Sequence, residues 1–216
     1  MEKKIGVIAG GPVDTQMGVD VLTAKGLTAC SYPAANFARE QTEFQMQPLD
    51  MRTEKIRSLI RNAKSDGVDA MMIYCNSLSS TVDMETLSQE LEIPVVTPLM
   101  AYAQYAKQYG TLAVIAGNNQ GLAGIERAIL ASNLSATVIG LSLLPMVIEI
   151  EAGTPPEQIA EKFALKNAMN VFEHAGAEAL ILGCTHFPYI HQSLKPCTAM
   201  PILDPADQMY DMLVMS

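Results

Sequence analysis

The chain has 216 residues, of which 49% are hydrophobic and 17% are charged, a composition that excludes a disordered or collagen-like chain and allows a sizeable buried core. Its 14 Lys and Arg against 23 Asp and Glu give a net charge of −9, which repels a phosphate backbone, so nucleic acid is not an expected partner. No apolar run approaches the roughly 18 residues of a membrane span, and we expect a cytoplasmic protein without a membrane partner.

Short runs rich in Val, Ile and Leu alternate with longer amphipathic segments, a pattern typical of parallel strands joined by crossover helices. The expected helices include 52–63 and 156–174, the second with Thr154 as its N-cap and two prolines at its start. The predicted fold class is therefore α/β with parallel sheets. The expected strands, in chain order, are 4–9, 27–32, 70–74, 95–97, 111–116, 136–141, 179–182 and 202–203.

Three short segments recur at about half the chain length, which indicates an internal repeat. The offsets between matching segments are 112 − 5 = 107, 176 − 67 = 109 and 200 − 93 = 107. We therefore predict two related halves. The matching pairs are 5–10 (IGVIAG) with 112–117 (LAVIAG), 67–75 (GVDAMMIYC) with 176–184 (GAEALILGC), and 93–98 (IPVVTP) with 200–205 (MPILDP).

Each half has one cysteine directly after a predicted buried strand, at the edge where open parallel sheets bind ligands. Cys75 and Cys184 hold matching places in the repeat, and polar residues follow both. Free cysteines are often simply buried apolar residues, which is the alternative interpretation. Unsatisfied N–H groups and a helix dipole are expected to lower the pKa of such thiols. Two thiols at one cleft can act as a base on one face of a carbon atom and an acid on the other.

The remaining cysteines, Cys30 and Cys197, have no counterpart in the repeat and are interpreted as structural. We expect all four cysteines to be reduced, because four widely spaced cysteines do not form the disulfide framework of a small secreted domain. No metal site is expected either. Cys184 and His186 would need two more ligands at suitable spacing, and the sequence offers none.

Residues 74–77 (YCNS) and 182–188 (LGCTHFP) resemble the two signature motifs of the aspartate/glutamate racemase superfamily, the cofactor-independent amino-acid racemases. The resemblance covers essentially the whole chain. It implies two pseudo-symmetric parallel-sheet α/β subdomains with the active site in the cleft between them. The first would comprise residues 1–97, with 200–216 returning to it, and the second residues 98–199.

The resemblance also implies a function: racemisation of an amino acid, aspartate or glutamate, by proton transfer between the catalytic thiols of Cys75 and Cys184. Cys75 would take the proton from the D-enantiomer and Cys184 from the L-enantiomer. No cofactor is implied, and the chain has no glycine-rich phosphate loop of the common types. A homodimer is compatible with the resemblance by analogy.

Several further residues are candidates for binding a small carboxylate or amino-acid substrate. Asp14 is equally a candidate N-cap for the following helix, and His186 is equally a histidine that only supports the site through a hydrogen bond. The first loop departs from the family, because residues 9–11 (AGG) replace the Asp-Ser of glutamate racemases. Likewise, residues 117–119 (GNN) replace a common Thr. The candidate substrate-binding residues are Gly11, Asp14, Thr15, Asn76, Ser77, Thr185 and His186.

Two charged residues are candidate auxiliary groups. Glu151 holds the place of an acidic residue in glutamate racemases, and its alternative interpretation is a solvated charge at a helix start. Arg39 offers a guanidinium that could clamp a carboxylate, or is simply solvated.

Other reactions of the superfamily also fit parts of these motifs. A hydantoin racemase and a maleate isomerase remain alternatives, as does a non-catalytic small-carboxylate-binding protein. The presence of both cysteines argues against a one-cysteine decarboxylase.

Overall fold

The computed structural model describes residues 3–36, 44 and 46–215, and the chain divides into two compact units. The first unit comprises Met1–Met100 with Ala206–Ser216, and the second comprises Ala101–Pro205. The expected boundaries were 97/98 and 199/200. The second boundary lies later than expected because the strand at 202–203 pairs within the second unit, so that only the segment from Ala206 returns to the first unit.

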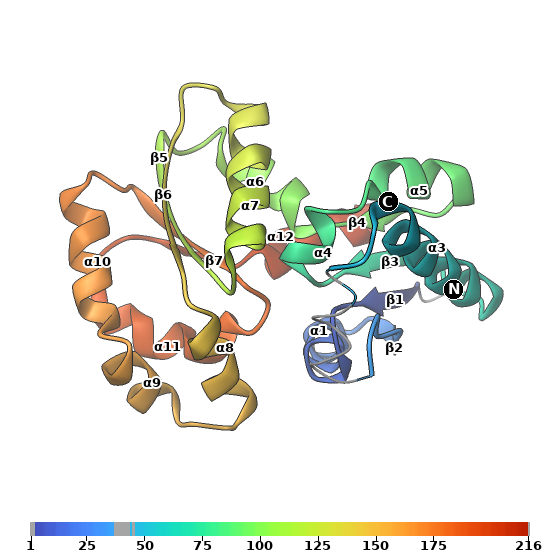
Figure 1. The fold of residues 1–216 in the computed structure, drawn as a ribbon, viewed down its shortest axis with the longest axis horizontal. Coiled ribbons are helices and arrows are strands. Elements are labelled where there is room, and N and C mark those ends of the chain that lie inside the picture. The colour runs from blue at the N-terminus through green and yellow to red at the C-terminus, as the bar shows by residue number, and fades with distance from the viewer. Residues whose placement is uncertain (1–2, 37–43, 45, 216) are drawn as a thin grey trace. The chain divides into compact units, whose positions relative to one another are not determined.

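The first unit contains a four-stranded parallel sheet in the order β2-β1-β3-β4 (Figure 1). β1 and β3 are central and, apart from Lys4 at the start of β1, completely buried, which fits the apolar sequences of their remaining residues. The strands are β1 (Lys4–Ile8), β2 (Thr28–Ser31), β3 (Ala70–Ile73) and β4 (Val95–Val96), and the helices are α1 (Pro12–Ala24), α3 (Leu49–Ser65), α4 (Asn76–Ser79), α5 (Met84–Leu91) and α12 (Pro205–Met215).

The second unit repeats this arrangement with the order β6-β5-β7-β8. In Figure 1, α7 and α10 lie on opposite sides of its sheet. The strands are β5 (Thr111–Ala116), β6 (Thr137–Ser142), β7 (Ala179–Gly183) and β8 (Ile202–Leu203). The helices are α6 (Pro98–Tyr105), which begins in the first unit, α7 (Asn119–Ser132), α8 (Leu144–Glu151), α9 (Pro156–Lys162), α10 (Leu165–His174) and α11 (His191–Leu194), with 3-10 turns at Phe187–Ile190 and Lys195–Cys197.

The strand register confirms the internal repeat. Ile5 pairs with Ala70 in the first sheet, and their counterparts at offsets of 107 and 109, Leu112 and Ala179, pair in the second. The β3–β4 pairing likewise recurs between β7 and β8. Both halves therefore place equivalent residues at the carboxyl edge of their sheets. The predicted fold class, two related parallel-sheet α/β halves, is confirmed.

The C-terminal helix α12 completes the core of the first unit. Met209 and Leu213 are fully buried there among residues of the first sheet and its helices. Burial of a side chain of this size contributes roughly 1.5–3 kcal/mol to stability.

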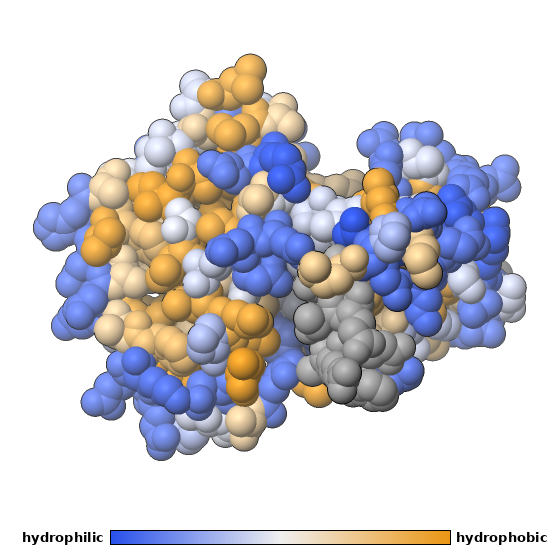
Figure 2. Space-filling view, in the orientation of Figure 1, coloured by the Kyte–Doolittle hydropathy of each residue, from blue (hydrophilic) through white to orange (hydrophobic). Residues whose placement is uncertain are grey.

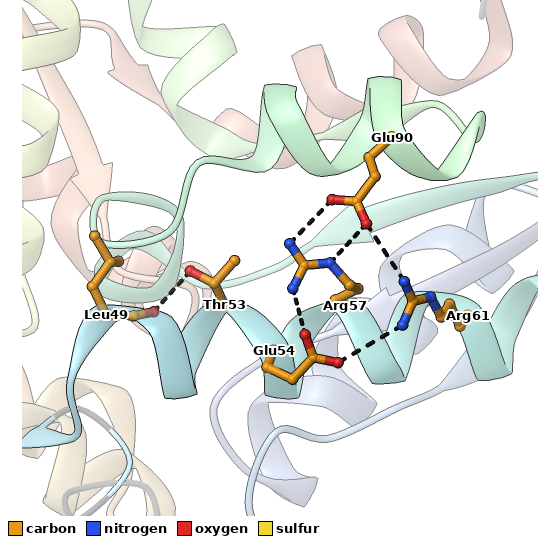
Figure 3. A network of polar contacts seen from close by, with 6 residues as sticks. All are labelled: Leu49, Thr53, Glu54, Arg57, Arg61 and Glu90. Carbon is orange, nitrogen blue, oxygen red and sulfur yellow. Dashed lines mark hydrogen bonds and ion pairs between the residues drawn. The ribbon is translucent and has the colours of Figure 1, made fainter.

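A network of ion pairs joins α3 to α5 on the surface of the first unit (Figure 3). Arg57 Nε lies 2.8 Å from Glu90 Oε1, and Arg57 Nη1 lies 2.5 Å from Glu54 Oε2. Arg61 also reaches Glu90, at 3.5 Å. Because solvent reaches and screens these charges, each pair adds little to the stability of the fold. Figure 2 shows mostly hydrophilic residues over the region of α3 and α5, at the right of the view.

The single helix expected over 156–174 is wrong, because the structure has two helices separated at Ala164, whose φ is 48°. The apolar positions explain the break: α9 buries Ile159, whereas α10 buries Leu165, Met169 and Phe172. A continuous helix would place Lys166, seven residues after Ile159, on the buried face. The break at Ala164 shifts the buried face by one residue, from position 166 to Leu165, so that Lys166 stays exposed.

Thr154 is not an N-cap, as had been expected. The N-cap of α9 is Pro155, and the Thr154 hydroxyl donates to Glu149 Oε2 at 2.8 Å. Within the part of the chain that the structure describes, no helix combines the length and apolar character that crossing a membrane requires.

Candidate active site

Cys75 lies two residues beyond β3 and forms the N-cap of the short helix α4. Its side chain is buried, and its Sγ lies 3.4 Å from the Ser77 hydroxyl. The Ser79 hydroxyl donates to the Cys75 carbonyl at 2.8 Å, which fixes the backbone at this turn. The first unit thus holds one thiol at the carboxyl edge of its sheet, as predicted from the sequence.

The pKa of the Cys75 thiol is raised above its usual value. Burial is the main cause, and the negative charge of Asp14 adds to it. The Ser77 hydroxyl and the N–H groups of Leu78 and Ser77 act in the opposite direction but do not outweigh burial. The expectation of a lowered pKa is therefore wrong for Cys75, whose surroundings favour the neutral thiol.

Asp14 folds back onto the loop that precedes α1. Its carboxylate accepts hydrogen bonds from the N–H groups of Gly11, at 2.7 Å, and Gly10, at 2.9 Å. Gly11 is the N-cap of α1, so Asp14 is three residues into the helix, and the alternative of an N-cap at Asp14 is wrong. The Thr15 hydroxyl, also buried, donates to the Gly11 carbonyl at 2.5 Å.

In the second unit, Cys184 directly follows β7 and begins a chain of polar contacts. Its Sγ lies 3.7 Å from His186 Nδ1, and His186 Nε2 lies 3.1 Å from Glu151 Oε1. His186 is buried, whereas Glu151 is partly exposed. An imidazole in this place can take the thiol proton, and the carboxylate can stabilise the imidazolium that results.

Glu151 is the last residue of α8, so its interpretation as a solvated charge at a helix start is wrong. This contact could not be predicted directly from the sequence, because 35 residues separate Glu151 from His186. A second contact of Cys184 was also missed. Gly117, the residue after β5, lies against the sulfur: a Cβ built on it would be 2.8 Å from Cys184 Sγ.

The remaining predicted residues lie beside the two thiols within their own units. Asn76 and Ser77 follow Cys75, Thr185 follows Cys184, and all three side chains are buried. Arg39 falls outside the described residues. Among the residues that are described, no cluster of three or more His, Cys, Asp or Glu side chains could hold a metal ion.

The fold and these contacts define a class of protein: a duplicated parallel-sheet α/β chain with one cysteine at the carboxyl edge of each sheet. The family model for Asp/Glu/Hydantoin racemase matches residues 33–213. The chain belongs to this family.

Two curated relatives illustrate the similarity. A glutamate racemase from Limosilactobacillus reuteri is 31% identical over 171 residues, which cover 77% of this chain and 61% of the relative. A glutamate racemase from Deinococcus radiodurans is 27% identical over 154 residues, covering 68% of this chain and 50% of the relative. The matches therefore span between half and three fifths of the length of these relatives.

Solved structures show the same fold. The glutamate racemase from Francisella tularensis, in complex with D-glutamate, superposes with a TM-score of 0.77 at 21% identity, covering 99% of this chain and 80% of that one. An aspartate racemase homologue from Pyrococcus horikoshii superposes with a TM-score of 0.71 at 15% identity, covering 99% and 98% of the two chains.

Proposed function

We propose that the protein is a cofactor-independent racemase of a small acidic amino acid, aspartate or glutamate, that uses Cys75 and Cys184 as opposed acid and base. The observation that carries this proposal is the line of contacts from Cys184 through His186 to Glu151, together with a second thiol at the equivalent place of the repeated fold. The relatives named glutamate racemase support the choice of substrate.

In this mechanism the substrate α-carbon lies between the two sulfur atoms. For the L-enantiomer, His186 first accepts the Cys184 proton, and the resulting thiolate removes the α-proton. The Cys75 thiol then donates its proton to the opposite face of the carbanion, which yields the D-enantiomer and leaves Cys75 as the thiolate. The reverse reaction begins from that thiolate, so protons and charges balance in both directions.

The raised pKa of Cys75 suits the acid role in this direction, because the thiol keeps its proton until the carbanion forms. Asn76, Ser77 and Thr185 are proposed to hold the substrate α-carboxylate and to stabilise the charge that develops on it. The N–H groups of Gly10 and Gly11 already bind the Asp14 carboxylate, so they have a smaller part in substrate binding.

The test is the exchange of the α-proton in deuterium oxide, followed by proton NMR with pure enantiomers of aspartate and glutamate. We expect the wild-type protein with reduced thiols to exchange and racemise at least one of the two amino acids without an added cofactor. No exchange with either amino acid would contradict the proposal. Exchange only with 5-substituted hydantoins, or isomerisation of maleate, would assign another reaction of the family and also contradict it.

Single cysteine variants test the two-thiol step. Cys75→Ala and Cys184→Ala are each expected to reduce the rate of racemisation by a factor of about 10² to 10⁴, since each removes one acid–base group. Cys75→Ala should retain slow exchange only with the L-enantiomer, and Cys184→Ala only with the D-enantiomer. Cys30→Ala is the matched control and should remain active. Equal exchange of both enantiomers in one cysteine variant would exclude two opposed bases.

A further inference from the structure

Gly117 is the residue that follows β5, and it lies next to Cys184 because β5 and β7 are paired. The last residue pair in that register is Ala116 with Gly183, so the next residue of each strand is Gly117 and Cys184. A Cβ atom built on Gly117 would lie 2.8 Å from Cys184 Sγ, closer than Cβ atoms approach other atoms in proteins. The sulfur therefore occupies the space that any larger residue at 117 would need.

The backbone at Gly117 does not itself require glycine. Gly117 is not among the residues with a positive φ, and an L-residue can adopt its conformation without strain. The reason for glycine at this place is therefore space. Two other groups bound that space: Val147 Cγ2 would lie 3.3 Å from the added atom and Cys184 Cβ 3.5 Å from it.

Any movement of the sulfur would alter its contact with His186. Sγ and Nδ1 are 3.7 Å apart, near the long end of a hydrogen bond to sulfur. A methyl group at 117 would have to push the sulfur away or turn it into another staggered rotamer, because the overlap is with the side chain's own terminal atom. Either movement changes the distance from the sulfur to the imidazole.

We propose that Gly117 is a positioning residue: by leaving room for the Cys184 sulfur beside β5, it holds the thiol in reach of His186. This inference rests on the proposed function only for the acid–base role of the Cys184 thiol. The packing of Gly117 against Cys184 is a property of the second unit alone. Two measurements that need no racemase activity test it.

The first measurement is a double-mutant cycle on thermal unfolding with Gly117→Ala, Cys184→Ala and the double variant. Gly117→Ala should lower the Tm of the wild type. It should lower the Tm of Cys184→Ala much less, because the sulfur that it meets is gone. Should the single variant fail to fold, the double variant should still fold. An equal loss of Tm in both backgrounds, or a double variant as unstable as the single one, would overturn the inference.

Gly140→Ala is the matched control. A Cβ on Gly140 in β6 would lie 2.5 Å from Leu122 Cδ1, a comparable overlap in the same unit with a side chain other than Cys184. Its effect on Tm should be the same with and without the Cys184 sulfur. A control that behaved like Gly117→Ala would show that the coupling is not specific to position 117 and would count against the proposal.

The second measurement is the alkylation of each cysteine by iodoacetamide from pH 5.5 to 9, resolved by peptide mass spectrometry. Comparison with His186→Ala defines the part of the Cys184 profile that depends on the imidazole. Gly117→Ala should slow the alkylation of Cys184 at pH 7 roughly tenfold, which is the low end of the effect expected when a hydrogen bond to a charged group is lost. The pH profile of Cys184 in this variant should match its profile in His186→Ala. Cys75 should react as in the wild type. An unchanged rate and profile at Cys184 would refute the proposed role.

The outcomes separate this inference from the proposed function. A wild-type protein without α-proton exchange would contradict the racemase, whereas the unfolding cycle and the Cys184 profile would still decide the role of Gly117. If the wild type is an active racemase but Gly117→Ala leaves the alkylation profile of Cys184 unchanged, only the inference about Gly117 is contradicted.

Discussion

At the scale of single residues, the two thiols differ in what surrounds them. Cys75 is buried beside a charged carboxylate and a hydroxyl, whereas Cys184 contacts an imidazole that is itself bonded to Glu151. Equivalent positions in the repeat have thus acquired different chemistry. The imidazole beside Cys184 is a nearby proton acceptor, whereas burial favours the neutral form of the Cys75 thiol.

Removal of the carboxylate beside His186 should reduce turnover without unfolding the protein. Glu151→Gln keeps a side chain of the same size but cannot stabilise an imidazolium, so we expect kcat to fall about tenfold to a hundredfold with a smaller change in KM. Glu149→Gln is the control: it lies on the same helix and pairs with Lys162 rather than with His186. A Glu151→Gln protein with wild-type kcat would show that the contact has no part in turnover.

The raised pKa of Cys75 predicts the pH dependence of its alkylation. Because burial and the charge of Asp14 favour the neutral thiol, the thiolate should form only above the pH at which an ordinary thiol ionises. Asp14→Asn removes the charge, so the profile of Cys75 should move to lower pH, while that of Cys184 stays in place. Site-resolved alkylation against pH measures both profiles. A shift of Cys75 to higher pH in this variant would contradict the assigned cause.

At the scale of secondary structure, the junction between α9 and α10 is a local weakness. Ala164 adopts a left-handed conformation that is unfavourable for a residue with a Cβ atom. Ala164→Gly should raise the free energy of unfolding by about 0.5–1 kcal/mol, after allowance for the more flexible unfolded chain. Ala168→Gly, inside α10, should lower it by about 0.5–1 kcal/mol. Urea unfolding measures both, and destabilisation by Ala164→Gly would contradict this reading of the junction.

The strands could be predicted from the sequence to within one residue at each end, because most are short apolar runs bounded by polar residues, glycine or proline. The repeat was also visible, since two of its three landmark pairs lie on central strands and the third lies on the edge strands β4 and β8. The helix break at Ala164 was missed because 156–174 is amphipathic throughout, and only the change of phase between Ile159 and Leu165 reveals two helices.

The positions of the candidate site residues could be predicted where they follow strand ends, but contacts between residues far apart in the sequence could not, and the roles of these residues stay predictions. The cysteines and the polar residues after them follow from strand ends. The contact of Glu151 with His186 depends on where α8 ends, and that of Gly117 with Cys184 depends on the pairing of two strands. Likewise, the pKa of Cys75 depends on how deeply the fold buries the thiol, which a local motif does not specify.

At the scale of the whole chain, the first unit depends on a segment far from it in sequence. Removal of residues 205–216 would take Met209 and Leu213 out of its core, and loss of even one such buried side chain typically costs about 2–5 kcal/mol. We expect the truncated protein to lose hydrogen-exchange protection in β1 and β3 and to keep it in β5 and β7. Equal protection in both sheets, measured by mass spectrometry, would contradict this division of the chain.

The place of α12 also has a consequence for the order in which the protein matures on the ribosome. The second unit is one continuous stretch, Ala101–Pro205, and all of it has been synthesised before Met209 and Leu213 are added. At about 5–20 residues per second, the nascent first unit waits several seconds for the helix that completes it. The half that is translated first is therefore the half that is finished last, and its incomplete core is the surface that a chaperone would meet during synthesis.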